Sequence, residues 1–172
     1  MHKKIIILGG SGFIAQELGK LLTKNNYEVI VYTRNIDNTY LSFPAKIRLW
    51  NGKELNDDLS DIYGVINLCG EGVFNKPWSK KFIQNLYDSR LEPTKALVKA
   101  VKINPSIKVV INASAIGYYG SNNSEVDEYS LPGNGILADI CKKWEQEAFA
   151  ISLTTRLVTT RFGVVLGLDR KS

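Results

Sequence analysis

The chain has 172 residues, of which 44% are hydrophobic and 23% charged, and its net charge is +5. These values are ordinary for a globular domain that buries one core. No run of about 18 apolar residues occurs, so we expect no membrane partner, and the apolar run Ile5–Leu8 is too short for a signal peptide. Two cysteines, Cys69 and Cys141, provide no disulfide framework, which favours a cytoplasmic protein.

The basic residues are scattered along the chain, and pairs of lysines are their longest runs. Proteins that bind nucleic acid instead gather basic residues into a patch or stripe. We therefore expect no nucleic-acid partner and interpret the positive charge as attraction for an anionic cofactor in a cleft. The single histidine, His2, lies beside the N-terminus, so we expect no histidine-based metal site.

Strand and helix patterns alternate along the sequence. In chain order we expect strand Lys4–Leu8, helix Phe13–Lys24, strand Glu28–Tyr32, strand Gly64–Leu68, a helix from Lys80 through Asn85 toward Lys102, strand Lys108–Asn112, helix Ala138–Ala150 and strand Thr159–Val165. The polar segment Ser121–Gly135 is predicted to be an exposed loop. This alternation predicts an α/β fold, with a parallel sheet covered by helices on both faces.

Glycines lie between the first predicted strand and the first predicted helix. Gly9, Gly12 and Ala15 have the spacing G-x-x-G-x-x-A. Gly9 permits a tight turn, Gly12 lets the backbone approach a pyrophosphate, and Ala15 permits close packing of helix on strand. The helix N-terminus adds amide donors and a positive dipole end. In this context the motif predicts a Rossmann-type doubly wound sheet with a central first strand; a glycine-rich turn without a ligand is the alternative.

The residues at the end of the second predicted strand indicate which of the two nicotinamide cofactors binds. It reads Tyr32-Thr33-Arg34, with no acidic residue before Asp37. An acid at this place accepts hydrogen bonds from the adenosine ribose and repels a 2′-phosphate, whereas an arginine pairs with that phosphate. We therefore predict NADP(H) in preference to NAD(H). The alternative is that Arg34 is a solvated loop residue.

Six segments carry a further signal in combination: GGSGFIA, INLCGE, WSKKFIQNLYDSRLEPT, SAIGYYG, KWE and RFGVVLG. Together they resemble the extended short-chain dehydrogenase/reductase superfamily, and within it the atypical, nucleoside-diphosphate-sugar epimerase-like "epimerase family proteins". The resemblance implies an NAD(P)-dependent epimerase, dehydratase or oxidoreductase. It also implies a sugar nucleotide or carbonyl compound as small-molecule substrate and leaves a homodimer open. Such proteins have about 300 residues, so residues 1–172 would be the NADP-binding domain of a longer protein, with most of the C-terminal substrate lobe missing.

The resemblance also implies which residues contact the cofactor. These are Gly9, Gly10, Ser11, Gly12, Phe13 and Ile14 for the diphosphate, Thr33 and Arg34 for the adenosine phosphate, Leu68, Cys69 and Gly70 for the loop along the cofactor, and Asn85 and Arg90 on the following helix. Arg90 stands where many members carry an asparagine that supports an active-site water network. An ordinary surface charge is the alternative for Arg90.

The catalytic residues are where this sequence departs from the family pattern. Extended members use a hydroxyl residue and a Tyr-x-x-x-Lys pair, in which the lysine lowers the tyrosine pKa. Ala115 occupies the hydroxyl position here, Leu137 the tyrosine position and Cys141 the lysine position, so we expect Leu137 and Cys141 to face the nicotinamide. Cys141 is interpreted as a small buried hydrophobe. The remaining candidates with transferable protons are weak, namely Tyr118, Ser114 and Lys142, while Tyr119 is interpreted as structural.

The three tryptophans receive separate interpretations. Trp144 is predicted to lie in the core. Trp78 opens a helix and is expected in the core, with coverage of the cofactor as the alternative. Trp50 is predicted to end a strand close to the adenine side.

Two hypotheses of function remain from the sequence. The first is an NADP(H)-dependent epimerase or oxidoreductase with non-standard acid/base groups. The second is a non-catalytic module that senses NADP(H) and passes its occupancy to a protein partner. The absent relay favours the second hypothesis, and the cofactor motif is compatible with both.

Overall fold

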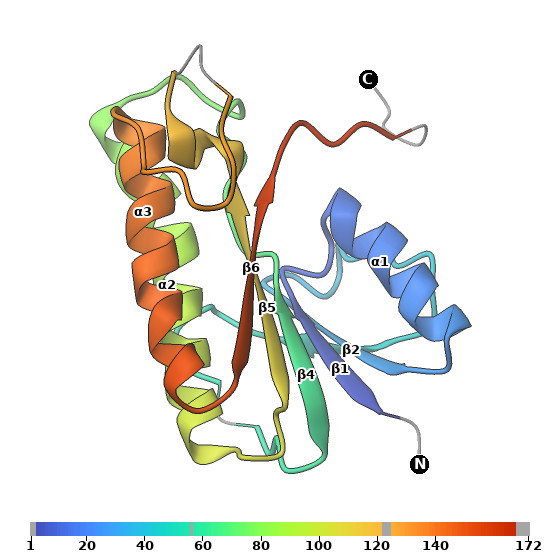
Figure 1. Ribbon diagram of the computed structural model, residues 1–172. Helices are drawn as coiled ribbons and strands as arrows, with labels where there is room; N and C mark the ends of the chain where they lie inside the picture. The colour runs from blue at the N-terminus through green and yellow to red at the C-terminus, as the bar shows by residue number, and fades with distance from the viewer. Residues whose placement is uncertain (1–2, 56, 122–124, 168–172) are drawn as a thin grey trace.

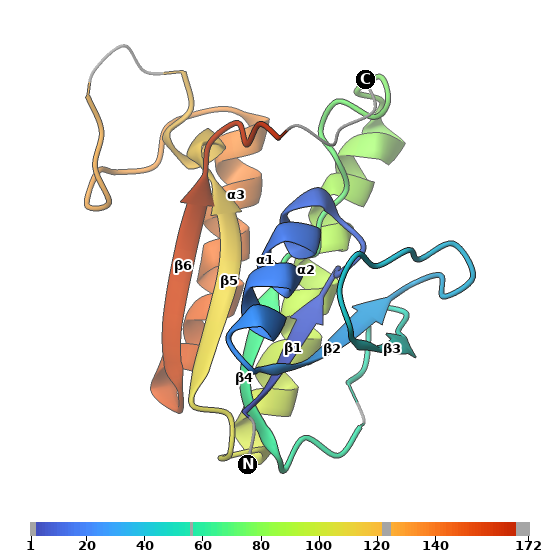
Figure 2. The same ribbon diagram turned by 90° about the vertical axis from the view of Figure 1, so that its right-hand side faces the viewer.

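The computed structural model describes residues 3–55, 57–121 and 125–167. Its elements in chain order are β1 (Lys4–Leu8), α1 (Phe13–Lys24), β2 (Glu28–Thr33), β3 (Lys46–Leu49), β4 (Ile62–Asn67), α2 (Lys80–Ile103), β5 (Val109–Ala115), the 3-10 helix η1 (Ile116–Tyr119), α3 (Ile136–Phe149), the 3-10 helix η2 (Ala150–Leu153) and β6 (Arg156–Phe162). Helix α1 lies on one face of the sheet, and α2 and α3 lie side by side on the other (Figures 1 and 2).

The described strands form one parallel sheet of six, in the order β3-β2-β1-β4-β5-β6. This is the strand order of a Rossmann-type doubly wound fold. The chain reverses its direction of winding between β1 and β4, and ligands of such sheets bind at that point, outside the carboxyl ends of the strands. The predictions of a Rossmann-type sheet and of an interior first strand are therefore confirmed.

Burial on both faces explains the apolar runs that form the strands. Ile5–Leu8 are all buried, because parallel strands covered by helices leave neither side to water. Ile6 and Leu8 contact the core beneath α2, whereas Ile7 contacts the smaller core beneath α1. The side chains of β1 thus divide between the two layers, as the alternation of a strand requires.

The observed bounds differ from the predicted ones in places that have physical causes. Strand β3 (Lys46–Leu49) was not among the strands predicted with bounds, and only the expectation that Trp50 ends a strand pointed to it. It is a short edge strand whose side chains are mostly exposed, so it lacks an apolar run. Strand β6 was predicted at Thr159–Val165 but lies at Arg156–Phe162, and Val164 beyond it is 83% exposed. Helix α2 continues through Pro93 to Ile103.

The predicted core position of Trp144 and the predicted strand end at Trp50 are confirmed, and the nearness of Trp50 to an adenine stays a prediction. Trp144 is buried on α3, and Trp50 directly follows β3, where its backbone N–H donates to the carbonyl of Thr33 at 2.8 Å. Trp78 was expected in the core, and this is wrong. It is 43% exposed, just before α2, with its indole N–H bonded to the carbonyl of Val73.

None of the helices in the described ranges combines the length and the hydropathy that crossing a bilayer requires. No group of three or more His, Cys, Asp or Glu side chains within those ranges is arranged to hold a metal ion. His2 lies outside the described residues.

Candidate functional site

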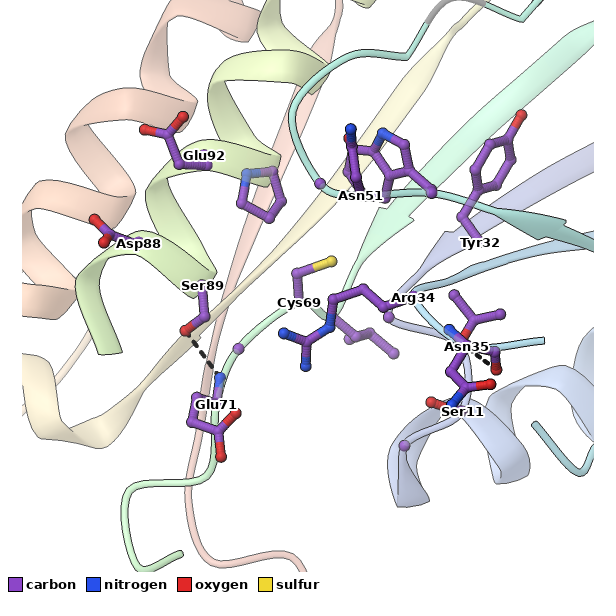
Figure 3. A pocket seen from close by; sticks show the side chains of 18 of the residues that line it. Ser11, Tyr32, Arg34, Asn35, Asn51, Cys69, Glu71, Asp88, Ser89 and Glu92 are labelled. Carbon is purple, nitrogen blue, oxygen red and sulfur yellow. Dashed lines mark hydrogen bonds between the residues drawn. The ribbon is translucent and has the colours of Figure 1, made fainter. Parts of the chain in front are cut away.

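A cleft of about 610 Å³ opens at the carboxyl ends of β1, β2 and β4, opposite the first half of α2 (Figure 3). Its walls come from four places: the glycine loop after β1, the end of β2, the segment after β3, and the loop after β4 together with α2. The lining residues include Gly9, Ser11, Gly12, Thr33, Arg34, Asn35, Trp50, Asn51, Leu68, Cys69, Gly70, Glu71, Asn85, Asp88, Ser89 and Glu92.

The backbone of the glycine loop after β1 lies close to the backbone of the loop after β4. Gly9 has φ +75°, and a Cβ there would lie 3.0 Å from the backbone of both Leu68 and Cys69. Gly12 caps the start of α1 without a side-chain hydrogen bond, and a Cβ on it would meet only the carbonyl of Gly9 at 3.6 Å. The first amides of a helix have no partner within it, and such amides can bind an anion. Ala15 is fully buried against the sheet, as the motif requires.

The structure divides the predicted diphosphate residues into two groups. Gly9, Ser11 and Gly12 line the cleft, whereas Gly10, Phe13 and Ile14 are not among its lining residues. Gly10 faces the sheet, since a Cβ on it would lie 2.4 Å from Cγ1 of Val31. Contact of these last three residues with a cofactor stays a prediction.

The end of β2 presents one exposed cation and several neutral polar groups. Thr33 is buried and its hydroxyl lies 2.9 Å from the hydroxyl of Thr39, while Arg34 is exposed and points across the cleft toward Cys69 (Figure 3). The described residues from 33 to 39 that line the cleft include no acid. This combination suits a phosphate better than a pair of ribose hydroxyls.

The loop after β4 forms the facing wall. Leu68, Cys69 and Gly70 line the cleft as predicted, and Asn85 joins them from α2. Burial raises the pKa of the Cys69 thiol to about 12, although the charge of Arg34 opposes the shift. A thiol with this pKa stays protonated at neutral pH and is a poor nucleophile. Arg90 is not among the lining residues; its guanidinium bonds to the carbonyl of Glu71 instead.

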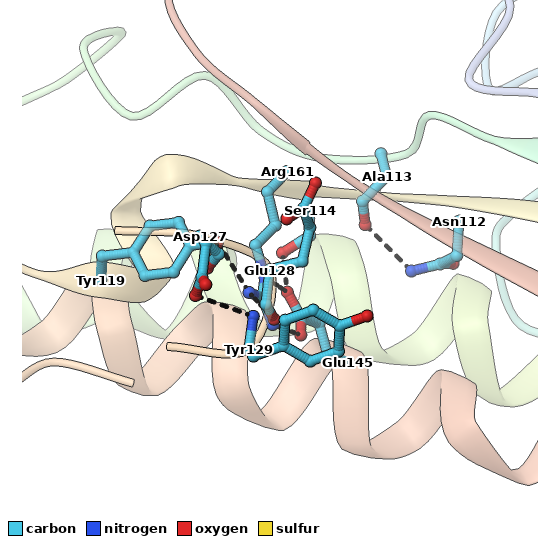
Figure 4. Close-up of polar contacts among 9 residues, drawn as sticks. All are labelled: Asn112, Ala113, Ser114, Tyr119, Asp127, Glu128, Tyr129, Glu145 and Arg161. Carbon is cyan, nitrogen blue, oxygen red and sulfur yellow. Dashed lines mark hydrogen bonds and ion pairs between the residues drawn. The ribbon is translucent and has the colours of Figure 1, made fainter. Parts of the chain in front are cut away.

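The three weak catalytic candidates lie away from the cleft. Ser114 is buried and donates its hydroxyl to Glu145 at 2.5 Å (Figure 4). The ring of Tyr118 lies 3.6 Å from the guanidinium carbon of Arg161, and Lys142 is exposed on α3. None of these three lines the cleft; Ser114 and Tyr118 instead contact Glu145 and Arg161, the two members of one ion pair.

Leu137 and Cys141 share one face of α3, as predicted, and this face packs against η1. A Cβ on Gly117 would lie 3.3 Å from Cβ of Leu137 and 3.8 Å from the sulfur of Cys141, so both residues face η1. Cys141 is 4% exposed, and burial raises its pKa, as expected of a small buried hydrophobe. Neither residue lines the cleft. Their position relative to a nicotinamide stays a prediction.

Arg161 and Glu145 form an ion pair that sequence reasoning missed. The guanidinium meets the carboxylate at two points, 2.9 and 2.8 Å, and both side chains are less than one-fifth exposed. Arg161 also donates to the hydroxyl of Tyr119, which itself bonds to the carbonyl of Asp127 (Figure 4). These bonds support the structural interpretation of Tyr119. The KWE and RFG segments contain both charged residues, but spacing alone gives no sign that they pair.

Other residues that line the cleft were not predicted from the sequence. Asn51, Asp88, Ser89 and Glu92 reach the cleft from the segment after β3 and from α2. The helical spacing of Asn85, Asp88, Ser89 and Glu92 was the available signal, because residues three or four apart share one face of a helix.

An α/β sheet with this strand order, a glycine loop at its switch point and a cleft above it defines a dinucleotide-binding protein of the Rossmann type. Residues 5–135 match the NAD dependent epimerase/dehydratase family, and the chain belongs to that family. It is therefore an epimerase-like protein of an NAD(P)-binding family.

Individual relatives agree with this assignment. The chain is 36% identical to an epimerase family protein of Mycobacterium leprae over 170 residues, which are 96% of this chain and 53% of that protein. It is 29% identical to the human epimerase family protein SDR39U1 in a crystal structure with NADPH, with a TM-score of 0.80 over 95% of this chain and 55% of the human one. A nucleoside-diphosphate sugar epimerase from Corynebacterium glutamicum gives 27% identity and a TM-score of 0.80, over 96% of this chain and 35% of that one. The chain thus spans about half the length of the curated relatives that it matches.

Proposed function

We propose that this chain binds NADP(H) in preference to NAD(H) in the cleft at the carboxyl ends of β1, β2 and β4. The observation that carries the proposal is Arg34, an exposed cation at the end of β2 with Thr33 beside it and no acid among the neighbouring lining residues. A guanidinium there attracts a 2′-phosphate, and the absent carboxylate removes the usual preference for free ribose hydroxyls. The NADPH in the human relative's structure supports the same cofactor.

As the function of the whole protein we propose an epimerase or oxidoreductase acting on a small molecule, either a sugar nucleotide or a carbonyl compound. The family match and the Corynebacterium nucleoside-diphosphate sugar epimerase support this substrate class. Residues 1–172 would then be the cofactor domain of a protein of about 300 residues, in keeping with relatives nearly twice as long. Two free cysteines support a cytoplasmic location.

A second candidate is a regulatory module that binds NADP(H) without chemistry. It is favoured by one observation: Ser114 is engaged with Glu145, Tyr118 lies against Arg161, and neither lines the cleft. A positioned acid or base contributes about 10²–10⁴ in rate, so its absence would leave hydride transfer very slow.

Calorimetric titration of the purified chain with NADPH and with NADH tests the cofactor proposal. We expect NADPH to bind at least about tenfold more tightly, the effect of roughly 1.4 kcal/mol. Equal affinities, or tighter binding of NADH, would contradict it. Turnover by the full-length protein then separates the two functions. Oxidation of NADPH with carbonyl compounds would show an oxidoreductase, and conversion of a sugar nucleotide into its epimer, which regenerates the cofactor, would show an epimerase, whereas a regulatory module would catalyse neither reaction.

A further inference from the structure

The wall of the cleft formed by Leu68–Glu71 has no regular secondary structure, yet α2 holds its last residue at both backbone polar atoms. The N–H of Glu71 donates to Oγ of Ser89 at 3.0 Å, and the carbonyl of Glu71 accepts from Nη2 of Arg90 at 3.0 Å (Figure 3 shows the first bond). We propose that Ser89 and Arg90 are positioning residues, a clamp that holds this wall ready for the nicotinamide half of the dinucleotide. The inference rests on the proposed cofactor binding.

Directional contacts with neutral groups fix Arg90 in place. Its Nη1 donates to the carbonyl of Leu86 at 3.0 Å, and its guanidinium carbon lies 5.3 Å from the centre of the Trp144 ring. The ion pairs between described residues do not include Arg90, and burial lowers its pKa. A guanidinium serves two carbonyls and a ring at once because it is planar and carries several donors, which an ammonium group cannot imitate.

The guanidinium also fills the space directly behind Gly70. A Cβ on Gly70 would lie 3.1 Å from Cζ and 3.2 Å from Nη2 of Arg90. The backbone of the wall therefore rests on Arg90 on one side and faces the cleft on the other. A change at Arg90 acts on the cleft through this backbone.

A buried network holds the other end of the same wall. The N–H of Cys69 donates to Oδ1 of Asn67 at 3.2 Å, and Nδ2 of Asn67 donates to the hydroxyl of Thr94 at 3.1 Å. Thr94 also accepts from the indole N–H of Trp144 at 3.0 Å. Asn67 and Thr94 are fully buried, where a satisfied polar network fixes one arrangement because any alternative leaves groups unpaired. Both ends of the wall are thus tied to the α2 layer.

The position of the wall indicates which part of the ligand it serves. In a Rossmann-type sheet the half built from β1, β2 and β3 takes the adenosine, and the half beyond the switch point takes the other nucleotide. Arg34 and Thr33 belong to the first half, whereas the clamped wall follows β4, the first strand beyond the switch point. A wall held in place before binding spares the ligand the free energy of ordering it.

The test compares a whole cofactor with its adenosine half. NADPH and adenosine 2′,5′-bisphosphate are titrated by calorimetry into the native chain and into the variants Arg90→Met, Arg90→Lys and Ser89→Ala. Arg156→Met is the matched control, since Arg156 is exposed at the start of β6, on the opposite edge of the sheet. Hydrogen exchange at the Glu71 amide is followed in each protein without ligand.

For Arg90→Met we expect NADPH to bind about tenfold more weakly, the loss of roughly one net hydrogen bond in organising the wall. Affinity for the bisphosphate should stay within about twofold, and the Glu71 amide should exchange faster. Arg90→Lys and Ser89→Ala should change NADPH binding in the same direction by less, and Arg156→Met should change nothing. A purely structural role would not alter the ratio of the two affinities.

Two results would overturn the clamp: Arg90→Met with unchanged NADPH affinity and unchanged exchange at Glu71, or an equal loss of both ligands. If the native chain binds no NADPH, the cofactor proposal fails by itself. The exchange measurement then still decides the clamp, because native-like protection of Glu71 in Arg90→Met would refute it.

Discussion

Replacing Arg161 by methionine should destabilise the protein substantially, because it leaves the carboxylate of Glu145 in the interior without its cation. The two side chains are 18% and 16% exposed and meet at 2.9 and 2.8 Å. After the change, Ser114 remains as the donor to Glu145, and the ring of Tyr118 loses the guanidinium that lies 3.6 Å from its centre. Truncating one partner of a buried ion pair costs about 3–5 kcal/mol.

Residual solvent contact puts the expected loss at the lower end, about 3 kcal/mol. For a chain of this size each kcal/mol lowers the melting temperature by roughly 2–4 °C, so Arg161→Met should melt about 6–12 °C below the native protein. Urea unfolding and thermal melting, both followed by circular dichroism, measure these quantities.

Two further variants check the cause. Tyr118→Phe keeps the ring against Arg161 and should change stability by less than about 0.5 kcal/mol. The double variant Arg161→Met with Glu145→Met should recover part of the loss, because two apolar groups can replace a buried pair at little cost. A loss below about 1 kcal/mol in Arg161→Met, or no recovery in the double variant, would refute this reasoning.

Two other predictions follow from the same structure. Gly10→Ala should cost roughly 1–3 kcal/mol in urea unfolding, because its Cβ would lie 2.4 Å from Val31; Gly12→Ala, with only a 3.6 Å contact, should unfold like the native protein yet bind NADPH more weakly in calorimetry. Burial and the bond to Asp139 raise the pKa of Tyr87 to about 12, above its ordinary value of about 10. The stability from Tyr87 should therefore be complete below about pH 10 and decline toward pH 12, and the decline in urea midpoints should be smaller in Tyr87→Phe.

The sequence predicted the parts of the fold that depend on local pattern. The apolar run at Ile5–Leu8, the glycine spacing after it and the helical period of Phe13–Lys24 gave the first βαβ unit with bounds close to those observed. Those features act over short stretches of chain, so one sequence suffices to recognise them. The bounds of strand β3 could not be found in this way, because its alternation of polar and apolar residues covers only the four residues Lys46–Leu49, too few to distinguish a strand from a loop.

The candidate site was predictable where it consists of backbone and strand ends. Gly9, Thr33, Arg34 and Cys69 line the cleft because parallel strands place their carboxyl ends together. The contacts of Arg90 were harder to predict, since a position on a helix indicates which face a residue lies on but not which residue it contacts. Its contacts with Glu71 and Trp144 join residues far apart in the chain, and only the packed structure reveals them.

The most direct measurement of the central claim is the affinity of Arg34→Asp for NADPH and NADH, set against Arg156→Asp, which makes the same charge change on the opposite edge of the sheet. We expect Arg34→Asp to lose about 1.5–3 kcal/mol of NADPH binding, the value of a hydrogen bond to a charged group, while NADH binding changes much less. Arg156→Asp should bind both cofactors like the native chain. Equal losses of affinity for NADPH and NADH in Arg34→Asp would show that Arg34 does not bind the 2′-phosphate.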